Sequence, residues 1–320
     1  MNTKLQNILV IGSGAWGTTL ARILSESAKE VFLYARNKKV VQDISVNRRN
    51  SAYLPNISLP DNILPTNDLR IDGIELIVMA TPVNTLTEIF QLLKSHTSNN
   101  LNFLLCSKGV DCRSLQLPSN ICREFFRDAN IALMSGPNLA KEIAQEKIAK
   151  TLIATENIFF ARQLQKIFTT KYFYPEISQD TISVELCGAY KNVLAIAVGI
   201  IKGLSFGENF LASFFVQALE EMKALIIRFE GNIDVVYSLA GIGDLLLTSC
   251  SLVSRNTNFG YRIALGTTRE QEGITVEGYH TTKAIRELAL IHKIDLPICN
   301  YVYNVLYKKG TLLDLINLLK

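Results

Sequence analysis

The chain has 320 residues, of which 48% are apolar and 19% are charged, and its formal net charge is +4. These values are typical of a folded globular protein with room for two domains, and they exclude an intrinsically disordered chain. The small charge and the scattered basic residues also argue against a nucleic-acid-binding protein.

Cysteine, histidine and hydropathy patterns predict the compartment. The six cysteines form no C-x-x-C pair and the three histidines show no metal-ligand spacing, so we expect a reduced, intracellular protein without a bound metal. The amino-terminal residues lack the pattern of a signal peptide, and the most apolar stretch, 193–201, is about half as long as a membrane span. We therefore expect a cytoplasmic protein without an integral membrane segment.

Five short apolar runs alternate with helix-length segments in the first half. They are residues 8–11, 31–34, 76–79, 103–106 and 131–134. Continuous apolar runs of this length predict a parallel sheet that is covered on both faces. Each run leads into a turn or a polar segment, and ligands bind at the carboxyl ends of such strands. We expect the ligand site there.

The pattern changes at about residue 180. Helical periodicity then dominates, in segments 182–202, 209–230, 281–292 and 298–308. We therefore predict an α/β protein with two domains, a doubly wound sheet over residues 1–185 and a mainly helical domain over 186–320.

Residues Gly12-Ser13-Gly14-Ala15-Trp16-Gly17 match the pattern G-x-G-x-x-G. The pattern alone is common, and a structural turn is the alternative, but here a buried strand precedes it and an apolar helix follows. In a dinucleotide site the first glycine permits a tight turn, the second lets the backbone approach the pyrophosphate, and the third allows close helix–strand packing. The helix amino terminus attracts the anion. We predict an oxidoreductase that uses a nicotinamide dinucleotide.

The second strand ends in Tyr34-Ala35-Arg36-Asn37, without the carboxylate that holds the ribose of NAD. Arg36 can pair with a 2′-phosphate, so we expect that NADP is at least accepted. A surface cation with no ligand is the alternative.

Lys191 has only apolar or small neighbours on its helical face: Cys187, Gly188, Leu194 and Ala195. Such a lysine either extends outward to water or lies in a cleft with a lowered pKa, as a general base requires. The sequence leaves both interpretations open.

Four other segments have charged groups in unusual settings. Lys108 follows a strand directly, although a surface lysine is the common alternative. Asp244 is a lone carboxylate among apolar residues and needs a partner, unless it caps a helix. Ser254-Arg255-Asn256 combines a guanidinium with two hydrogen-bonding side chains, which suits a phosphate. Glu277 is the single acid of a glycine-flanked loop, and its role is open.

Together these motifs resemble a known family over nearly the whole chain. They are Gly12-x-Gly14-x-x-Gly17, Ser107-Lys108-Gly109, Ser135-Gly136-Pro137-Asn138-Leu139-Ala140, Gly188-Ala189-x-Lys191-Asn192, Ala240-Gly241-x-Gly243-Asp244, Ser254-Arg255-Asn256 and Val276-Glu277-Gly278-Tyr279. The chain resembles the bacterial NAD(P)-dependent glycerol-3-phosphate dehydrogenases. The resemblance implies a Rossmann-type domain followed by a helical domain like that of 6-phosphogluconate dehydrogenase. It also implies reversible NAD(P)H-dependent reduction of dihydroxyacetone phosphate to sn-glycerol 3-phosphate, which supplies phospholipid biosynthesis.

The resemblance also assigns roles to residues. Lys191 would accept the proton of the substrate C2 hydroxyl, Lys108 would contact cofactor and substrate, and Asp244 would hold the two lysines. The implied cofactor-binding residues are Gly12, Gly14, Ala15, Trp16, Gly17, Arg36, Lys108, Ala140, Arg255 and Glu277. The implied substrate-binding residues are Lys108, Gly136, Asn138, Lys191, Asp244, Ser254, Arg255 and Asn256. A homodimer is expected by analogy.

Three positions depart from the family pattern. Ala15 stands where relatives often have serine, Asn138 replaces a frequent threonine or serine, and Thr275 stands where relatives often have valine. Two other functions fit the same motifs: a dehydrogenase for a β-hydroxy acid such as 6-phosphogluconate, and a dinucleotide-sensing protein without catalysis.

Overall fold

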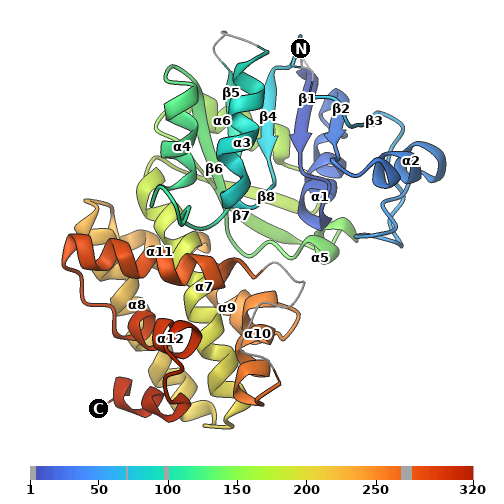
Figure 1. Ribbon diagram of the computed structural model, residues 1–320. Helices are drawn as coiled ribbons and strands as arrows, with labels where there is room; N and C mark the ends of the chain where they lie inside the picture. The colour runs from blue at the N-terminus through green and yellow to red at the C-terminus, as the bar shows by residue number, and fades with distance from the viewer. Residues whose placement is uncertain (1–4, 70, 97–100, 268–275, 320) are drawn as a thin grey trace. The chain divides into compact units, whose positions relative to one another are not determined.

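The computed structural model describes residues 5–69, 71–96, 101–267 and 276–319 (Figure 1). The chain divides into two compact units. The first unit comprises Met1–Ser107, Pro118–Met134 and Asn138–Thr181, and the second comprises Lys108–Leu117, Ser135–Pro137 and Ile182–Lys320. Two short segments of the second unit are thus inserted within the sequence of the first. The expected division at residue 185 stays a prediction.

The first unit is built on an eight-stranded sheet in the order β3-β2-β1-β4-β5-β6-β7-β8. The strands are β1 (Leu5–Ile11), β2 (Ala28–Tyr34), β3 (Ile63–Thr66), β4 (Leu76–Met79), β5 (Asn102–Leu105), β6 (Asn130–Ser135), β7 (Ala149–Ala154) and β8 (Phe173–Ser178). The pairings from β3 through β6, and that of β7 with β8, are parallel. The predicted fold class is confirmed, and five of these strands match the predicted apolar runs, although β5 ends one residue before its run does, at Leu105.

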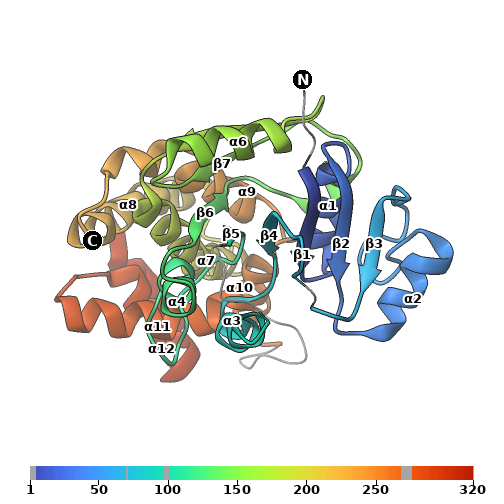
Figure 2. The same ribbon diagram turned by 90° about the horizontal axis from the view of Figure 1, so that it is seen from above.

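Helices cover both faces of the sheet, which explains the continuous apolar runs. One face packs against α1 (Ala15–Leu24) and α6 (Ile158–Phe168), with Ile8 and Val10 in its core. On the other face Phe103 contacts Phe90 of α3 (Leu86–Lys94) and Phe126 just beyond α4 (Pro118–Phe125). Figure 2 shows α6 on one side of the sheet and α3 with α4 on the other. The remaining elements are η1 (Val83–Thr85), α2 (Lys38–Asn47) and α5 (Ala140–Ala144).

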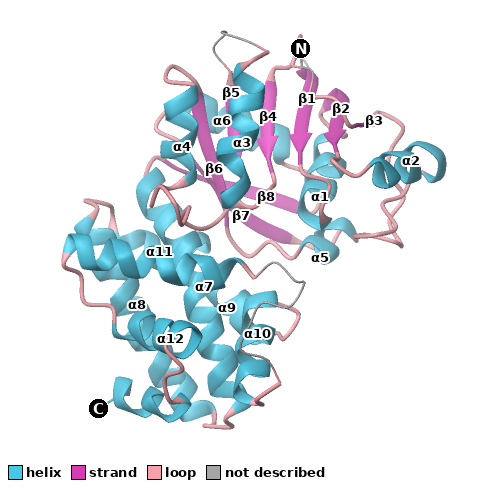
Figure 3. Cartoon of the chain, in the orientation of Figure 1, coloured by secondary structure: helices cyan, strands magenta, loops and turns pink. Residues whose placement is uncertain are grey.

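The second unit is helical in its described part, as predicted (Figure 3). Its elements are α7 (Thr181–Gly203), α8 (Glu208–Arg228), η2 (Ile233–Tyr237), η3 (Leu239–Gly243), α9 (Asp244–Cys250), α10 (Arg255–Ala264), α11 (Glu277–His292), α12 (Pro297–Tyr307) and η4 (Leu312–Leu319). Helix α7 is long and apolar enough to cross a membrane, but its apolar window is entirely buried within the fold. It is therefore the core helix of this unit.

Helices α7 and α10 touch through their backbones. A Cβ atom on Gly199 would lie 2.1 Å from the carbonyl oxygen of Thr257, and one on Gly260 would lie 2.0 Å from that of Ile196. Only glycine permits this approach. The crossing fixes the first turn of α10 against the middle of α7.

A buried carboxylate joins three helices of the same unit. Glu221 of α8 is 2% exposed, and it accepts hydrogen bonds from the Tyr190 hydroxyl of α7 and, at 2.7 Å, from the backbone N–H of Ile298. Helix α12 has no side-chain cap of its own, so Glu221 satisfies part of its first turn. Burial raises the pKa of Glu221 to about 7.

This shift predicts how stability depends on pH. An unfolded glutamate titrates near 4.5, whereas the fold favours the protonated form of Glu221 up to a pKa of about 7. The free energy of unfolding should therefore fall as pH rises through this interval, by about 3 kcal/mol in total. Urea unfolding between pH 4.5 and 8 measures it.

The variant Glu221→Gln keeps hydrogen-bonding capacity without titrating, so it should lose this pH dependence. Glu220→Gln is the matched control, because Glu220 is a half-exposed neighbour bonded to Lys223 at 2.7 Å. Parallel curves for the wild type and Glu221→Gln would contradict the assignment.

Candidate active site

Two glycines of the turn after β1 are required by the fold itself. Gly12 has a φ of +111°, and a Cβ atom there would lie 2.7 Å from the carbonyl oxygen of Ala80, directly after β4. A Cβ atom on Gly17 would lie 1.8 Å from the carbonyl oxygen of Gly12. Larger residues at either position would separate the turn from β4 and from α1.

Gly14 is different. Its φ of −67° suits any residue, and no heavy atom lies within 4 Å of the position that a Cβ atom would occupy. The internal packing of the fold therefore gives no reason for a glycine here, whereas a ligand that approaches the backbone does. The turn lies between β1 and β4, where the strand order reverses, and dinucleotides bind at such points. The open space and the first N–H groups of α1 fit a pyrophosphate.

Other predicted cofactor residues lie at the same edge of the sheet. Ala15 and Trp16 begin α1, and the Ala140 carbonyl accepts a hydrogen bond from Thr19 of α1 at 3.1 Å. Arg36 is exposed just beyond the end of β2. These residues thus gather around the carboxyl ends of β1 and β2.

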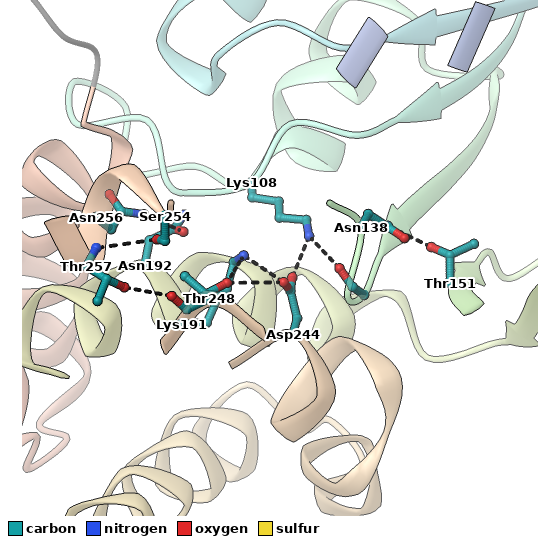
Figure 4. A network of polar contacts seen from close by, with 11 residues as sticks. Lys108, Asn138, Thr151, Lys191, Asn192, Asp244, Thr248, Ser254, Asn256 and Thr257 are labelled. Atoms are coloured by element: carbon teal, nitrogen blue, oxygen red, sulfur yellow. Dashed lines mark hydrogen bonds and ion pairs between the residues drawn. The ribbon is translucent and has the colours of Figure 1, made fainter. Parts of the chain in front are cut away.

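In the second unit, two lysines share one carboxylate (Figure 4). Lys108 Nζ lies 2.5 Å from Asp244 Oδ2, and Lys191 Nζ lies 2.8 Å from Asp244 Oδ1. Lys191 also donates to Thr248 Oγ1 at 2.8 Å, and Lys108 to the Gly136 carbonyl at 3.3 Å. Two ammonium groups and one carboxylate leave the cluster with a net positive charge.

Burial sets the protonation behaviour of this cluster. The Lys191 side chain is 10% exposed, so it lies inside the fold rather than extending outward. Burial lowers the pKa of Lys191 and the nearby Lys108 charge lowers it further, while Asp244 opposes both effects. Burial alone would raise the pKa of Asp244, but Lys108 and Lys191 together hold it below its ordinary value. Asp244 therefore stays ionised beside a lysine that can exchange a proton.

A π turn presents Asp244. The turn η3 precedes α9, whose first residue is Asp244, and within it Gly241 has non-helical φ and ψ of −88° and −107°. A Cβ atom on Gly241 would lie 2.2 Å from the carbonyl oxygen of Val236. Single π turns are frequent at functional sites because they redirect a side chain. Here the turn directs the carboxylate of Asp244 toward α7.

The first turn of α10 holds the predicted phosphate-binding residues. Ser254 caps the helix by accepting from the Thr257 N–H at 3.4 Å. Asn256 donates to Asn192 Oδ1 at 2.9 Å and accepts from the Gly278 N–H at 3.0 Å. Of the three predicted residues, only Arg255 is exposed.

Glu277 and Asn138 occupy different surroundings. Glu277 begins α11, with Oε1 3.9 Å from the Arg255 guanidinium. Burial raises its pKa, although the positive charges of Arg255 and Lys191 oppose the shift. Asn138 belongs to the first unit, where it donates to Thr151 Oγ1 at 2.9 Å. Thr275 lies outside the described residues.

Two polar residues near the lysine cluster were not among the predicted site residues, although Asn192 stands in one of the family motifs. Thr248 lies one helical turn after Asp244, and the i, i+4 spacing on α9 is the signal that could have found it. Asn192 follows Lys191 directly, and its buried Nδ2 group has no hydrogen-bond partner in the described part of the chain. A buried amide donor without a protein partner indicates a ligand or a water.

The two units together define a class of enzyme. A parallel sheet with this glycine turn binds dinucleotides, and a buried ammonium group beside a carboxylate can exchange a proton with a carbonyl oxygen. This combination is typical of dinucleotide-dependent dehydrogenases with a helical second domain.

The comparison with known families identifies the particular one. Residues 7–161 match the family described as the N-terminus of NAD-dependent glycerol-3-phosphate dehydrogenase, and residues 180–317 match its C-terminus. The chain belongs to the NAD-dependent glycerol-3-phosphate dehydrogenase family.

Individual relatives match over almost the entire chain. A glycerol-3-phosphate dehydrogenase of the NAD(P)+ type from Corynebacterium urealyticum is 34% identical and aligns over 97% of this chain and 96% of its own length. A glycosomal NAD+ enzyme of that name from Trypanosoma brucei is 35% identical over 96% of this chain and 91% of its own. The crystal structure of the Coxiella burnetii enzyme superimposes with a TM-score of 0.91 at 29% identity and covers 97% of both chains.

The contrast between the glycines predicts separable effects. Gly14→Ala should change the free energy of unfolding by no more than about 1 kcal/mol, because the space is open, yet it should weaken dinucleotide binding at least tenfold. Gly17→Ala, the matched control, should destabilise the protein by about 2 kcal/mol or more, because its Cβ atom meets a backbone carbonyl. Thermal melting and dinucleotide titration measure the two effects. Undiminished dinucleotide affinity in Gly14→Ala would contradict the assigned site.

Proposed function

We propose that this protein catalyses the reversible NAD(P)H-dependent reduction of dihydroxyacetone phosphate to sn-glycerol 3-phosphate. Family membership over nearly the whole chain supports the substrate. The single observation that carries the mechanism is the buried Lys191 ammonium group, bonded to Asp244 at 2.8 Å. We assign the dinucleotide to residues 1–185 together with Arg255 and Glu277, and the triose to residues 186–320 together with Lys108 and Gly136. Asn138 is also kept as a proposed substrate residue.

The proton transfer belongs to Lys191. A dinucleotide held at the glycine turn would supply or accept the hydride at the substrate C2 carbon. Lys191 gives its proton to the C2 oxygen during reduction and takes it back during oxidation, which a lysine of lowered pKa does readily. Asp244 keeps both lysines in place and stays ionised.

The hydrogen-bond count leaves a place for the substrate oxygen. An ammonium group has three N–H donors. Lys191 uses two of them on Asp244 and Thr248, and Lys108 uses two on Asp244 and Gly136. Counted over the described residues, one donor on each lysine remains for the C2 oxygen, where a positioned donor stabilises developing negative charge by about 3–4 kcal/mol.

The phosphate of the substrate is assigned to the first turn of α10. Arg255 supplies a planar guanidinium that can bind two phosphate oxygens at once. Ser254 and Asn256 belong to the same site. Their internal hydrogen bonds hold the turn in shape.

The proposed preference for NADP rests on the charge of the side chains after β2. None of the five residues directly after β2 is acidic, and Arg36 is exposed at its end. Arg36 therefore favours the 2′-phosphate of NADP, although NAD is also accepted in the family. Glu277 and Ala140 border the cofactor.

The cytoplasmic location stays a prediction because one relative is glycosomal, and the homodimer stays a prediction as well.

A spectrophotometric assay tests the proposal. The wild type should oxidise NADPH and NADH with dihydroxyacetone phosphate, and it should not reduce NADP+ with 6-phosphogluconate. Lys191→Ala should lower turnover by about 10²–10⁴-fold with little effect on dinucleotide affinity. Lys202→Ala is the control, because Lys202 lies on the same helix and, within the described residues, donates to the Ser249 carbonyl at 2.6 Å rather than to Asp244. Turnover of Lys191→Ala within tenfold of wild type would remove the proton-transfer role.

A second variant tests the phosphate site. Arg255→Ala should raise the Michaelis constant for dihydroxyacetone phosphate by at least tenfold, because a charge-assisted contact to the phosphate is lost. The unphosphorylated triose dihydroxyacetone should react equally poorly with variant and wild type. Arg262→Ala, in the last turn of the same helix, is the control. If discrimination between the two trioses is unchanged, Arg255 does not bind the phosphate.

A further inference from the structure

The glycine turn is held by a residue that lies outside the turn, Asn50. The side chain of Asn50 is buried, and its Nδ2 group donates to the Ser13 carbonyl at 2.8 Å and to Thr18 Oγ1 at 2.8 Å. Thr18 in turn donates to the same Ser13 carbonyl at 3.3 Å. These three residues form a closed triangle between the turn, the first helix and the segment after α2.

The backbone of Asn50 is itself fixed. Its carbonyl accepts from the N–H groups of Tyr53 and Leu54, at 3.1 and 2.7 Å, and Leu54 is buried. The neighbouring Ser51 N–H donates to Asp43 of α2 at 2.8 Å. The amide that reaches the glycine turn is therefore attached to a rigid support.

Peptide geometry turns this contact into an effect on the ligand site. In a trans peptide the C=O and the following N–H point in opposite directions. Because Asn50 and Thr18 hold the Ser13 oxygen, the N–H of Gly14 is directed away from them. No hydrogen bond among the described residues uses the Gly14 N–H, and the space beside the Gly14 Cα, where a Cβ atom would lie, is open, so this N–H is available to an anion.

The buried side chain of Asn50 lowers the stability of the fold. Its Oδ1 atom is buried and has no hydrogen-bond partner in the described part of the chain. A buried acceptor without a partner destabilises a fold by about 1–3 kcal/mol. The opposite amide orientation would place Oδ1 against the Ser13 oxygen, which is also an acceptor, so the amide cannot rotate to escape this cost. Stability alone does not explain an asparagine here.

We propose that Asn50 is a positioning residue of the dinucleotide site, which orients the Gly14 N–H toward the pyrophosphate by holding the Ser13 carbonyl. The inference rests on the proposed function, because it assumes that the glycine turn binds the dinucleotide. Asn50 acts through the turn and makes no contact with the reacting atoms.

The single tryptophan of the chain, Trp16, lies in the first turn of α1 and reports binding directly by its fluorescence. Titration of the wild type with NADPH and with ADP-ribose gives the dissociation constants without catalysis. Asn50→Ala should raise both constants about tenfold while the turnover at saturating NADPH stays near that of wild type. Asn50→Asp, which sets a carboxylate against the Ser13 oxygen, should raise them further.

Asn62→Ala is the matched control. Asn62 makes a similar pair of contacts in the same unit, to the Ser25 and Ala28 carbonyls at 2.9 and 3.3 Å, but at the opposite edge of the sheet. It should lower the melting temperature and leave the dissociation constants unchanged. If Asn50→Ala binds NADPH within twofold of wild type, the inference is overturned.

A second pair of variants covers the case in which Asn50→Ala does not fold. Thr18→Val breaks the triangle and should weaken NADPH binding, whereas Thr18→Ser keeps the hydroxyl and should restore it. Equal affinity in these two variants would overturn the inference. A wild-type protein whose Trp16 fluorescence does not respond to NADPH would instead overturn the proposed function, and this inference with it.

Discussion

One buried carboxylate organises the second unit. Asp244 is almost inaccessible to water, and such a charge is tolerated only beside compensating charges. Lys108 and Lys191 supply these positive charges from two segments that are distant in the sequence. The carboxylate in turn offsets the repulsion between the two ammonium groups. The π turn that presents Asp244 and the Thr248 hydroxyl that holds Lys191 both serve this arrangement. The reactivity of Lys191 follows from the same burial.

The glycine turn of the first unit obeys a different constraint, which is space. Gly12 and Gly17 are fixed by contacts inside the fold, whereas Gly14 faces an opening. The three glycines of a single sequence pattern are thus required for different physical reasons. Asn50 adds a polar constraint to these steric ones, because it fixes the direction of one peptide group.

Sequence patterns predicted the buried parts of this structure and not the partly exposed ones. In four of the five predicted strands the apolar run is buried on both faces, whereas β2 alternates between buried and partly exposed residues. The sequence analysis did not predict the strands β3, β7 and β8, because Pro65, Lys150 and Pro175 interrupt their apolar patterns. For the site, motifs indicated Lys191 and Asp244 but left burial open, since one helix cannot show what packs against it. Asn50 carries no sequence signal, because its partners are near only in space.

The backbone contact between α7 and α10 limits how such an enzyme can change. The residues that follow Ser254 and those around Asn192 are held together by main-chain contacts at Gly199 and Gly260 and by the side-chain hydrogen bond from Asn256 to Asn192. A larger side chain at either glycine would push the two helices apart, so we expect altered preference for longer or shorter substrates to arise by substitution elsewhere.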